Sequence, residues 1–234
     1  MSNRIPASYE PHFEVVSVIK ETEDKSIVKV RHRSSGALFL MRRLPSSADI
    51  YRQLLPVSSP YLPRIYEVLE EDDCCFILEE FVEGDLLSDM LQGATFSPSE
   101  TRRISLDICK ALYILHDLGL VHRDVKPENI MLRGQNAVLL DFDTSRQFKE
   151  EGTTDTQVLG TTGFAAPEQY GISQTDARAD IFALGVTMHL MLTGAHPSVK
   201  LAPGRFGRII SKCTMVQPDK RYSNILHLMK VLRS

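Results

Sequence analysis

The sequence predicts an α+β fold in which a β-rich first part, residues 1–82, precedes a helical second part, residues 83–234. In the first part, short apolar and β-branched runs alternate with turn residues, which is typical of strands. In the second part, apolar residues recur at spacings of three and four, which is the period of a helix that buries one face. Residues 81–85 fit neither pattern, so we predict that they connect two lobes of one domain.

The first part is expected to form a five-stranded sheet with one short helix. Residues 34–36 (Ser-Ser-Gly) and 72–73 (Asp-Asp) predict turns, because these residue types favour tight reversals of the chain. Pro45 and Pro56 end a strand and a helix, since proline lacks the backbone N–H that either element uses. The predicted strands are residues 13–19, 26–32, 37–44, 65–71 and 74–80, and the predicted helix is residues 49–55.

The second part contains clear helix signals. Ser97 is a typical N-cap, a proline follows at the first helical position, and Glu100 completes a capping box. A buried stripe is predicted on the helix that follows, formed by Ile104, Ile108, Leu112 and Leu115. Residues 177–192 predict a buried apolar helix that ends at Gly194, and residues 222–232 predict a last amphipathic helix.

The composition is that of an ordinary globular protein. Of the 234 residues, 43% are apolar and 24% are charged, which suits one large domain with a substantial core. The net charge of −3 predicts neither a nucleic-acid partner nor an anionic membrane. No apolar run approaches the roughly 20 residues of a spanning helix, and the first residues lack the apolar core of a signal peptide. We therefore expect a cytoplasmic protein.

The four cysteines do not predict a metal site. None belongs to a CxxC pair, and no histidine-rich segment accompanies them. Cys74 and Cys75 are neighbours in a predicted strand, so their side chains should face opposite sides of the sheet. We expect reduced, partly buried thiols, with a redox switch as the less supported alternative. The cysteines are Cys74, Cys75, Cys109 and Cys213.

The most informative segment is residues 122–129, which read His-Arg-Asp-Val-Lys-Pro-Glu-Asn. It supplies an acid (Asp124), a cation (Lys126) and an amide (Asn129), and a second acid, Asp141, follows. Phosphoryl transfer needs such groups: a carboxylate to orient the nucleophile, oxygen ligands for a metal, and a cation beside the transferred phosphate. A polar turn that binds nothing is the alternative. The wording and spacing of this segment resemble the catalytic loop and metal-binding motif of protein kinases.

This resemblance, which runs from about Tyr9 to the end of the chain, implies a bilobal fold and a role for each of these residues. Asp124 resembles the catalytic carboxylate, and Lys126 resembles the lysine that contacts the transferred phosphate in serine/threonine kinases. Asn129 and Asp141 resemble the residues that bind Mg²⁺, a hard cation that prefers oxygen ligands. The implied cofactors are ATP and Mg²⁺, and the implied second substrate is a protein with a serine or threonine hydroxyl.

Other matching residues imply architecture rather than chemistry. Glu168 and Arg221 resemble a buried ion pair that holds the helical lobe together, so loss of either partner should destabilise it. Asp180 resembles the helix residue that braces the catalytic loop. His122 and Phe142 resemble two residues that pack together beneath the site.

The segment between residues 141 and 168 resembles an activation segment. Thr161 is expected to form a hydrogen bond near the catalytic residues. Arg123 precedes the catalytic acid, and such an arginine can bind a phosphorylated loop residue. Acidic neighbours weigh against modification of this loop, so an unmodified, solvated loop is the alternative. The candidate sites are Thr153, Thr154 and Thr156.

The nucleotide-binding half departs from the family pattern. The loop at residues 20–25 (Lys-Glu-Thr-Glu-Asp-Lys) stands where glycines usually cover the phosphates, so it is either an altered phosphate lid or a charged hairpin turn. Arg42 occupies the position of the usual lysine; Arg43 could do so only if the strand slipped by one residue and turned its faces over. Leu40 replaces a small residue and should crowd the adenine pocket.

The acid that normally pairs with this lysine is also displaced. Asp49 is the best candidate on the predicted helix, but Glu79 falls at the position behind the nucleotide, where an unpaired acid is costly. We therefore hypothesise that Glu79 forms an ion pair with Arg42. The complete set of predicted nucleotide contacts is Ile19, Ile27, Leu40, Arg42, Glu79, Glu80, Val82 and Met131.

The sequence predicts a serine/threonine protein kinase that transfers the γ-phosphate of ATP to a protein hydroxyl. Its motif sequences resemble those of bacterial kinases. The complete catalytic half favours this enzyme. The altered loop, Arg42 and Leu40 favour a pseudokinase that binds nucleotide or serves as a scaffold. A small-molecule kinase of the same fold is a third alternative, weakened by the Ala-Pro-Glu stretch at residues 166–168 and by Asp180.

Overall fold

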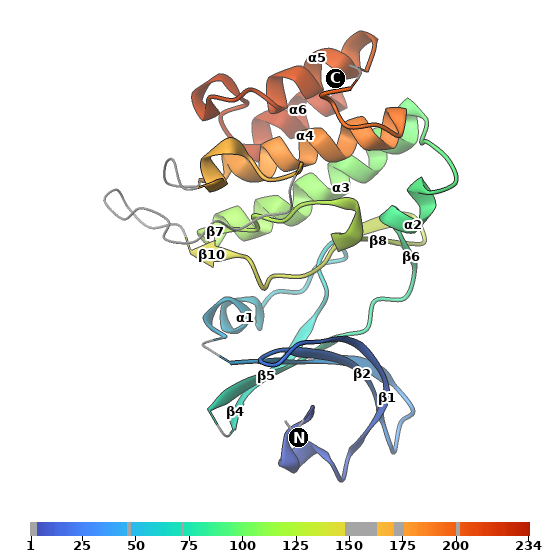
Figure 1. Ribbon diagram of the computed structural model, residues 1–234, viewed down its shortest axis with the longest axis vertical. Coiled ribbons are helices and arrows are strands. Elements are labelled where there is room, and N and C mark those ends of the chain that lie inside the picture. Colours follow the sequence, from blue (N-terminus) through green and yellow to red (C-terminus); the bar gives the residue numbers. More distant parts are fainter. Residues whose placement is uncertain (1–3, 46–47, 72, 148–162, 171–175, 200–201) are drawn as a thin grey trace. The chain divides into compact units, whose positions relative to one another are not determined.

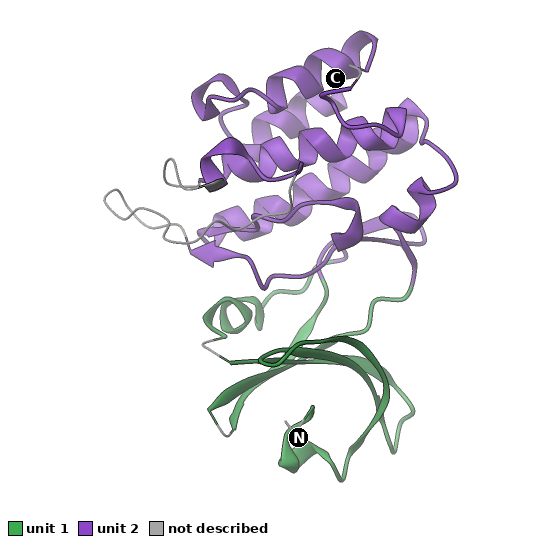
Figure 2. Cartoon of the chain, in the orientation of Figure 1, with its two compact units in different colours: residues 1–59, 63–83 green, residues 60–62, 84–234 purple. Residues whose placement is uncertain are grey.

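The computed structural model describes residues 4–45, 48–71, 73–147, 163–170, 176–199 and 202–234. The chain forms two compact units (Figure 2), one of residues 1–59 and 63–83 and the other of residues 60–62 and 84–234. The predicted division after Val82 lies one residue before this boundary and keeps residues 60–62 with the first part. We describe each unit by itself.

Unit 1 is a five-stranded antiparallel sheet with the strand order β1-β2-β3-β5-β4 and one short helix, α1. The predicted sheet and helix are confirmed, although β1 runs two residues further than predicted. Figure 1 shows the strong twist of the sheet. The bounds are β1 Phe13–Glu21, β2 Ser26–His32, β3 Leu38–Leu44, α1 Asp49–Leu54, β4 Ile65–Glu71 and β5 Cys74–Glu80.

The strand register assigns each residue of β3 to one face of the sheet. Leu40 lies opposite Glu79, and Arg42 lies opposite Ile77, so these side chains share a face. The alternate residues of β3, including Met41, join the other face, whose apolar core consists of Ile5, Phe13, Val28, Val30, Met41, Phe76 and Leu78. Strand β3 has therefore not slipped, and Arg42 keeps the predicted position.

The segment before β1 ties the two outer strands of the sheet together. Arg4 donates two hydrogen bonds of 2.9 Å to the carboxylate of Glu21 on β1. The short 3₁₀ turn η1 (Ala7–Tyr9) reaches the other edge, where the Ala7 N–H donates to Glu71 on β4 at 2.7 Å. Ile5 of this segment belongs to the apolar core and Tyr9 packs against it, so the segment covers the apolar face of the sheet.

Unit 2 is mainly helical, with two small sheets, β10-β7 and β6-β8-β9, beside the helices. Figure 1 shows α3 and α4 between these sheets and the helices α5 and α6. The bounds are β6 Asp85–Leu86, α2 Leu87–Leu91, α3 Pro98–Asp117, β7 Leu120–Val121, η2 Pro127–Asn129, β8 Ile130–Arg133, β9 Asn136–Leu139, β10 Arg146–Gln147, η3 Pro167–Tyr170, α4 Arg178–Thr193, α5 Gly204–Cys213, η4 Pro218–Lys220 and α6 Ile225–Arg233.

The capping residues predicted for α3 and α4 lie at the ends of these helices, and α6 begins three residues later than predicted. Ser97 and Glu100 form the capping box at the start of α3, and the predicted stripe on this helix is fully buried. Helix α4 ends at Gly194, whose φ of 67° suits glycine. Helix α6 starts at Ile225 rather than at residue 222, because the Asn224 side chain caps it. No helix within the described ranges is long and apolar enough to cross a membrane.

All four cysteines are free thiols, and Cys74 is the most exposed of them. We expect a thiol reagent to modify Cys74 in the folded protein but to spare Cys109 and Cys213. Burial raises the pKa of the Cys109 and Cys213 thiols, so the reactive thiolate is scarce and inaccessible. Titration with a chromogenic disulfide, with and without denaturant, measures this difference. Rapid modification of Cys109 under native conditions would contradict it.

Candidate active site

The carboxylate of Asp124 is the centre of a compact polar cluster in unit 2. Lys126 Nζ lies 2.7 Å from Asp124 Oδ2. Asn129 Nδ2 donates to the same oxygen at 2.9 Å and to the Asp124 carbonyl at 2.9 Å. The structure thus brings the three predicted catalytic residues into direct contact, and two donors fix the orientation of the carboxylate.

Local backbone geometry presents these side chains. The segment leaves β7, passes through Arg123 with a φ of 71°, and enters the 3₁₀ turn η2, which ends at Asn129. A positive φ is unfavourable for a residue other than glycine, so surrounding contacts must hold Arg123 in place. Gln169 supplies one of them, because its Nε2 donates to the Arg123 carbonyl at 2.9 Å.

Asp141 is held next to Asn129 by the backbone. The Leu140 N–H donates to the Asn129 carbonyl at 2.8 Å, and Asp141 follows with a φ of 66°. An amide and a carboxylate are suitable oxygen ligands for Mg²⁺, which usually takes further ligands from phosphate and water. Among the described residues, no group of three or more His, Cys, Asp or Glu side chains could hold a metal alone. The amide of Asn129 and the carboxylate of Asp141 fit a metal that takes its remaining ligands from phosphate and water.

Asp180 on α4 holds the backbone of the segment that contains Asp124, as predicted. It is fully buried and accepts hydrogen bonds from the backbone N–H groups of His122 at 3.0 Å and Arg123 at 2.8 Å. His116 Nε2, at the end of α3, lies 2.8 Å from Asp180 Oδ2. Burial opposes ionisation of Asp180, but the hydrogen bond and charge of His116 and the charge of His122 hold its pKa below the usual range.

We expect Asp180→Asn to lower the free energy of unfolding by about 2–4 kcal/mol, because buried donors lose a charged acceptor. Since the pKa of Asp180 is lowered in the folded state, its contribution is present above the ordinary carboxyl range and disappears as the pH falls through the lowered pKa. Urea unfolding at neutral and acidic pH measures both effects. Asp117→Asn, at an exposed position of α3, is the control; equal stability of both variants would contradict the role of Asp180.

The other predicted architectural contacts in unit 2 are confirmed. His122 packs edge-on against Phe142, with ring centroids 5.8 Å apart. Arg221 donates two hydrogen bonds to Glu168, at 2.6 and 2.8 Å, and both side chains are buried. Arg221 also donates to three backbone carbonyls, so the pair joins η3, α4 and the segment before η4.

In unit 1, the hypothesised ion pair between Arg42 and Glu79 is present. Arg42 Nε donates to Glu79 Oε1 at 2.7 Å, and the side chains are only 6% and 2% exposed. Asp49, the other candidate acid, starts α1 with a side chain that is 75% exposed and accepts a hydrogen bond from Arg52. The acid at the end of β5 thus neutralises the arginine of β3.

The predicted nucleotide contacts of unit 1 are only partly grouped. Ile27 lies opposite Arg42, so it shares a face of the sheet with Leu40, Arg42 and Glu79. Ile19 lies at the irregularity of β1 and is 55% exposed. Glu80 exchanges backbone and side-chain hydrogen bonds with Arg64, and Val82, after β5, is buried.

In unit 2, Met131 lies on β8 opposite Leu86, the last residue of β6. A Cβ atom on Gly84 would lie 2.3 Å from the Leu132 carbonyl oxygen, so only glycine allows this close approach of the connecting segment.

The loop at residues 20–25 is a closed hairpin turn. The Thr22 N–H donates to the Lys25 carbonyl at 2.8 Å, and the Thr22 hydroxyl accepts from the Lys25 N–H at 3.2 Å. From β3, Arg43 donates to the Glu23 carbonyl at 3.1 Å and holds the turn. The structure therefore shows a defined turn, and whether it covers phosphate stays a prediction.

Two residues of the site were not assigned a role from the sequence. His116 contacts Asp180, and Gln169 links the Arg123 carbonyl to the Ala166 N–H. A histidine in the last turn of a helix and a glutamine after the Ala-Pro-Glu stretch were the only signals. Four residues of the predicted activation segment lie outside the described residues. They are the candidate phosphorylation sites Thr153, Thr154 and Thr156, and Thr161, which was predicted to form a hydrogen bond near the catalytic residues.

Comparison with known proteins gives consistent matches. A family model described as protein kinase domain matches residues 14–230. Serine/threonine-protein kinase PknB of Mycolicibacterium smegmatis is 34% identical over 155 residues, which cover 64% of this chain and 25% of that protein. PknB of Mycobacterium tuberculosis is 37% identical over 150 residues, 60% of this chain and 24% of that protein. Serine/threonine-protein kinase pkn2 of Myxococcus xanthus is 33% identical over 154 residues, which cover 62% of this chain and 19% of that protein. The chain spans a quarter or less of the length of these bacterial relatives.

Proposed function

The chain belongs to the protein kinase family, and from this premise we propose that it transfers the γ-phosphoryl group of ATP to a serine or threonine hydroxyl of a protein. The observation that carries the proposal is the contact of Lys126 and Asn129 with one oxygen of Asp124, at 2.7 and 2.9 Å. This geometry supplies an oriented carboxylate with a cation beside it, as phosphoryl transfer requires. The relatives named serine/threonine-protein kinases support the choice of substrate class.

In the proposed reaction, Asp124 orients the substrate hydroxyl and accepts its proton while the oxygen bonds to the γ-phosphorus. The bond from that phosphorus to the bridging oxygen breaks, and ADP leaves. Lys126 offsets the negative charge that spreads over the transferred group. Asn129 and Asp141 would hold Mg²⁺, which when bound shields the charge of the phosphates.

A pseudokinase is the second candidate, and one observation favours it. The Arg42 guanidinium, which replaces the expected lysine, is already engaged by buried Glu79. Because Glu79 offsets the charge of Arg42, this arginine attracts a phosphate less strongly than an unpaired arginine would. Under this reading the chain binds nucleotide without turnover. The cytoplasmic location stays a prediction.

The deciding experiment incubates the protein with γ-labelled ATP, Mg²⁺ and a generic acceptor such as casein or myelin basic protein. We expect label on serine and threonine of the acceptor, lost when EDTA removes the metal. Nucleotide binding measured by calorimetry, without any transfer of label, would favour the pseudokinase instead. Label on a sugar or an aminoglycoside but not on protein would favour a small-molecule kinase.

A further inference from the structure

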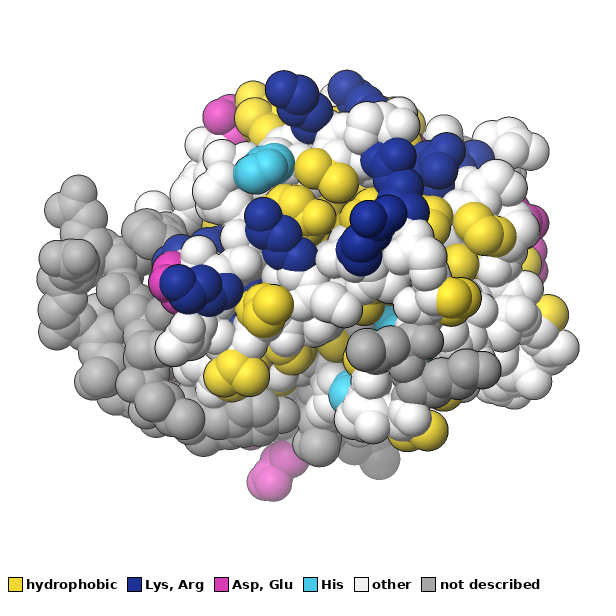
Figure 3. All heavy atoms as spheres, turned by 90° about the horizontal axis from the view of Figure 1, so that it is seen from above, with side chains coloured by type: hydrophobic (Ala, Val, Ile, Leu, Met, Phe, Trp, Pro, Cys, Tyr) yellow, Lys and Arg dark blue, Asp and Glu magenta, His cyan; other side chains and the backbone are white. Residues whose placement is uncertain are grey.

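The end of unit 2 that carries α5, η4 and α6 is strongly basic, although the whole chain has a net charge of −3. Between residues 204 and 234, Asp219 is the sole acidic residue of the sequence. Figure 3 looks onto this end and shows Lys and Arg side chains around apolar ones, with acidic side chains at the rim. The exposed cations are Arg205, Arg208, Lys212, Lys220, Lys230 and Arg233.

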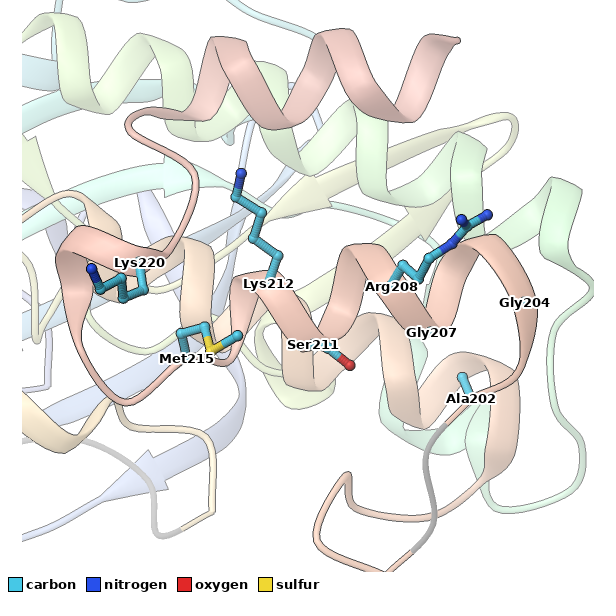
Figure 4. Close-up of a pocket in the computed structure, with 8 residues that line it drawn as sticks. All are labelled: Ala202, Gly204, Gly207, Arg208, Ser211, Lys212, Met215 and Lys220. Atoms are coloured by element: carbon cyan, nitrogen blue, oxygen red, sulfur yellow. The ribbon is translucent and has the colours of Figure 1, made fainter.

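A hollow of about 560 Å³ runs along α5 within this basic surface. Small residues of α5, namely Gly204, Gly207 and Ser211, contribute to its lining (Figure 4). Gly207 lies so close to the preceding segment that a Cβ atom would be 1.9 Å from the Ala202 carbonyl oxygen. The wall formed by Ala202 therefore depends on a glycine at this position.

Three cations and one apolar side chain line the same hollow: Arg208, Lys212, Lys220 and Met215. Lys212 Nζ lies 4.8 Å from the centre of the Tyr222 ring, and within the described part of the chain neither Arg208 nor Lys212 has an acidic partner. Among the described residues, the acidic partner of Lys220 is its neighbour Asp219, at 3.6 Å. Met215 is 46% exposed and offers an adaptable apolar contact.

The spacing of the cations suits an extended chain. Arg208 and Lys212 leave the same side of α5 (Figure 4) and lie four residues apart, which is roughly 6 Å along a helix. Side chains on one face of an extended strand recur about every 6.8 Å. Two carboxylates at alternate positions of such a strand can therefore pair with both cations.

We propose that this hollow, which we call the α5 groove, binds an extended acidic segment of a partner protein. The segment has Asp or Glu at every second position and an apolar residue that contacts Met215. A bilayer needs a continuous protruding apolar face, whereas this site is hollow. A single-stranded nucleic acid needs aromatic rings for stacking, but Tyr222 is only 4% exposed. Helices α3 and α4 separate α5 from the catalytic segment (Figure 1), so docking does not depend on the proposed transfer reaction.

The test uses fluorescence anisotropy with a labelled peptide of the sequence Glu-Ser-Glu-Ser-Leu-Ser-Glu-Ser-Glu. We expect saturable binding that weakens with added salt. Arg208→Glu should weaken it about tenfold or more, since an attraction becomes a repulsion at the centre of the site. Arg102→Glu, which makes the same charge change at an exposed position of α3, should leave binding unchanged. Lys212→Gln is the milder second variant, and thermal unfolding checks that each variant folds.

Two further probes separate the alternatives. A peptide of the same composition with all glutamates in one block should bind more weakly; equal binding would overturn the extended-strand geometry. Phosphatidylserine vesicles and a single-stranded oligonucleotide should bind no differently to Arg208→Glu and Arg102→Glu. If either probe depends on Arg208 while the peptide fails to bind, the groove is not a peptide site and the proposal is wrong.

Discussion

Asp124→Asn is expected to reduce phosphoryl transfer roughly a thousandfold, within the range that general acid–base groups contribute. The amide keeps an oxygen that can still accept hydrogen bonds from Lys126 and Asn129, so the cluster should survive. It cannot accept the proton of the substrate hydroxyl, so the chemical step slows while ATP affinity is largely retained. Initial rates with labelled ATP, together with nucleotide binding by calorimetry, separate these two effects.

The catalytic loop itself offers a matched control. Glu128 is an exposed carboxylate in the same segment, so Glu128→Gln makes the same chemical change without touching the cluster. This variant should transfer phosphate at nearly the wild-type rate. If Asp124→Asn were as active as Glu128→Gln, another group would have to be the base and the proposed mechanism would fail.

The elements of unit 1 could be predicted because their signals are local. Strands β2, β4 and β5 follow from β-branched runs bounded by turn residues, and the register of the sheet then fixes which side chains share a face. The contact between Arg42 and Glu79, 37 residues apart, was predicted differently, from the positions of both residues in the kinase family pattern and from the cost of an unpaired buried acid.

Contacts without a local pattern could not be predicted in the same way. The Arg4–Glu21 pair joins an irregular segment to β1, and His116 reaches Asp180 from another helix, 64 residues away. Helix α5 was missed because Gly204 and Gly207 lower helix propensity. Gly207 is present for the close approach to Ala202, a tertiary requirement that overrides propensity.

Breaking the pair of Arg42 and Glu79 is expected to cost about 3–5 kcal/mol of unfolding free energy, because either single change leaves a buried charge without its counter-ion. Glu79→Gln and Arg42→Met are the single variants. The exposed pair of Arg31 and Glu14, at 2.8 Å, is the control, and its removal should cost less than about 1 kcal/mol. Urea unfolding of each variant of the full chain measures the loss of unfolding free energy for both pairs. Equal losses for the two pairs would show that burial does not determine how much an ion pair stabilises this protein.

The double variant Arg42→Met with Glu79→Leu tests what the pair is for. Replacing both charges by apolar groups of similar size should restore most of the lost stability, since neither charge is then buried alone. If the pair positions nucleotide, this stable double variant should still bind ATP much more weakly than wild type. If it retains wild-type ATP affinity, the pair only fills the interior of the sheet. Arg42 would then have no part in nucleotide binding. This result would favour a pseudokinase, whereas the catalytic cluster of unit 2 favours an enzyme.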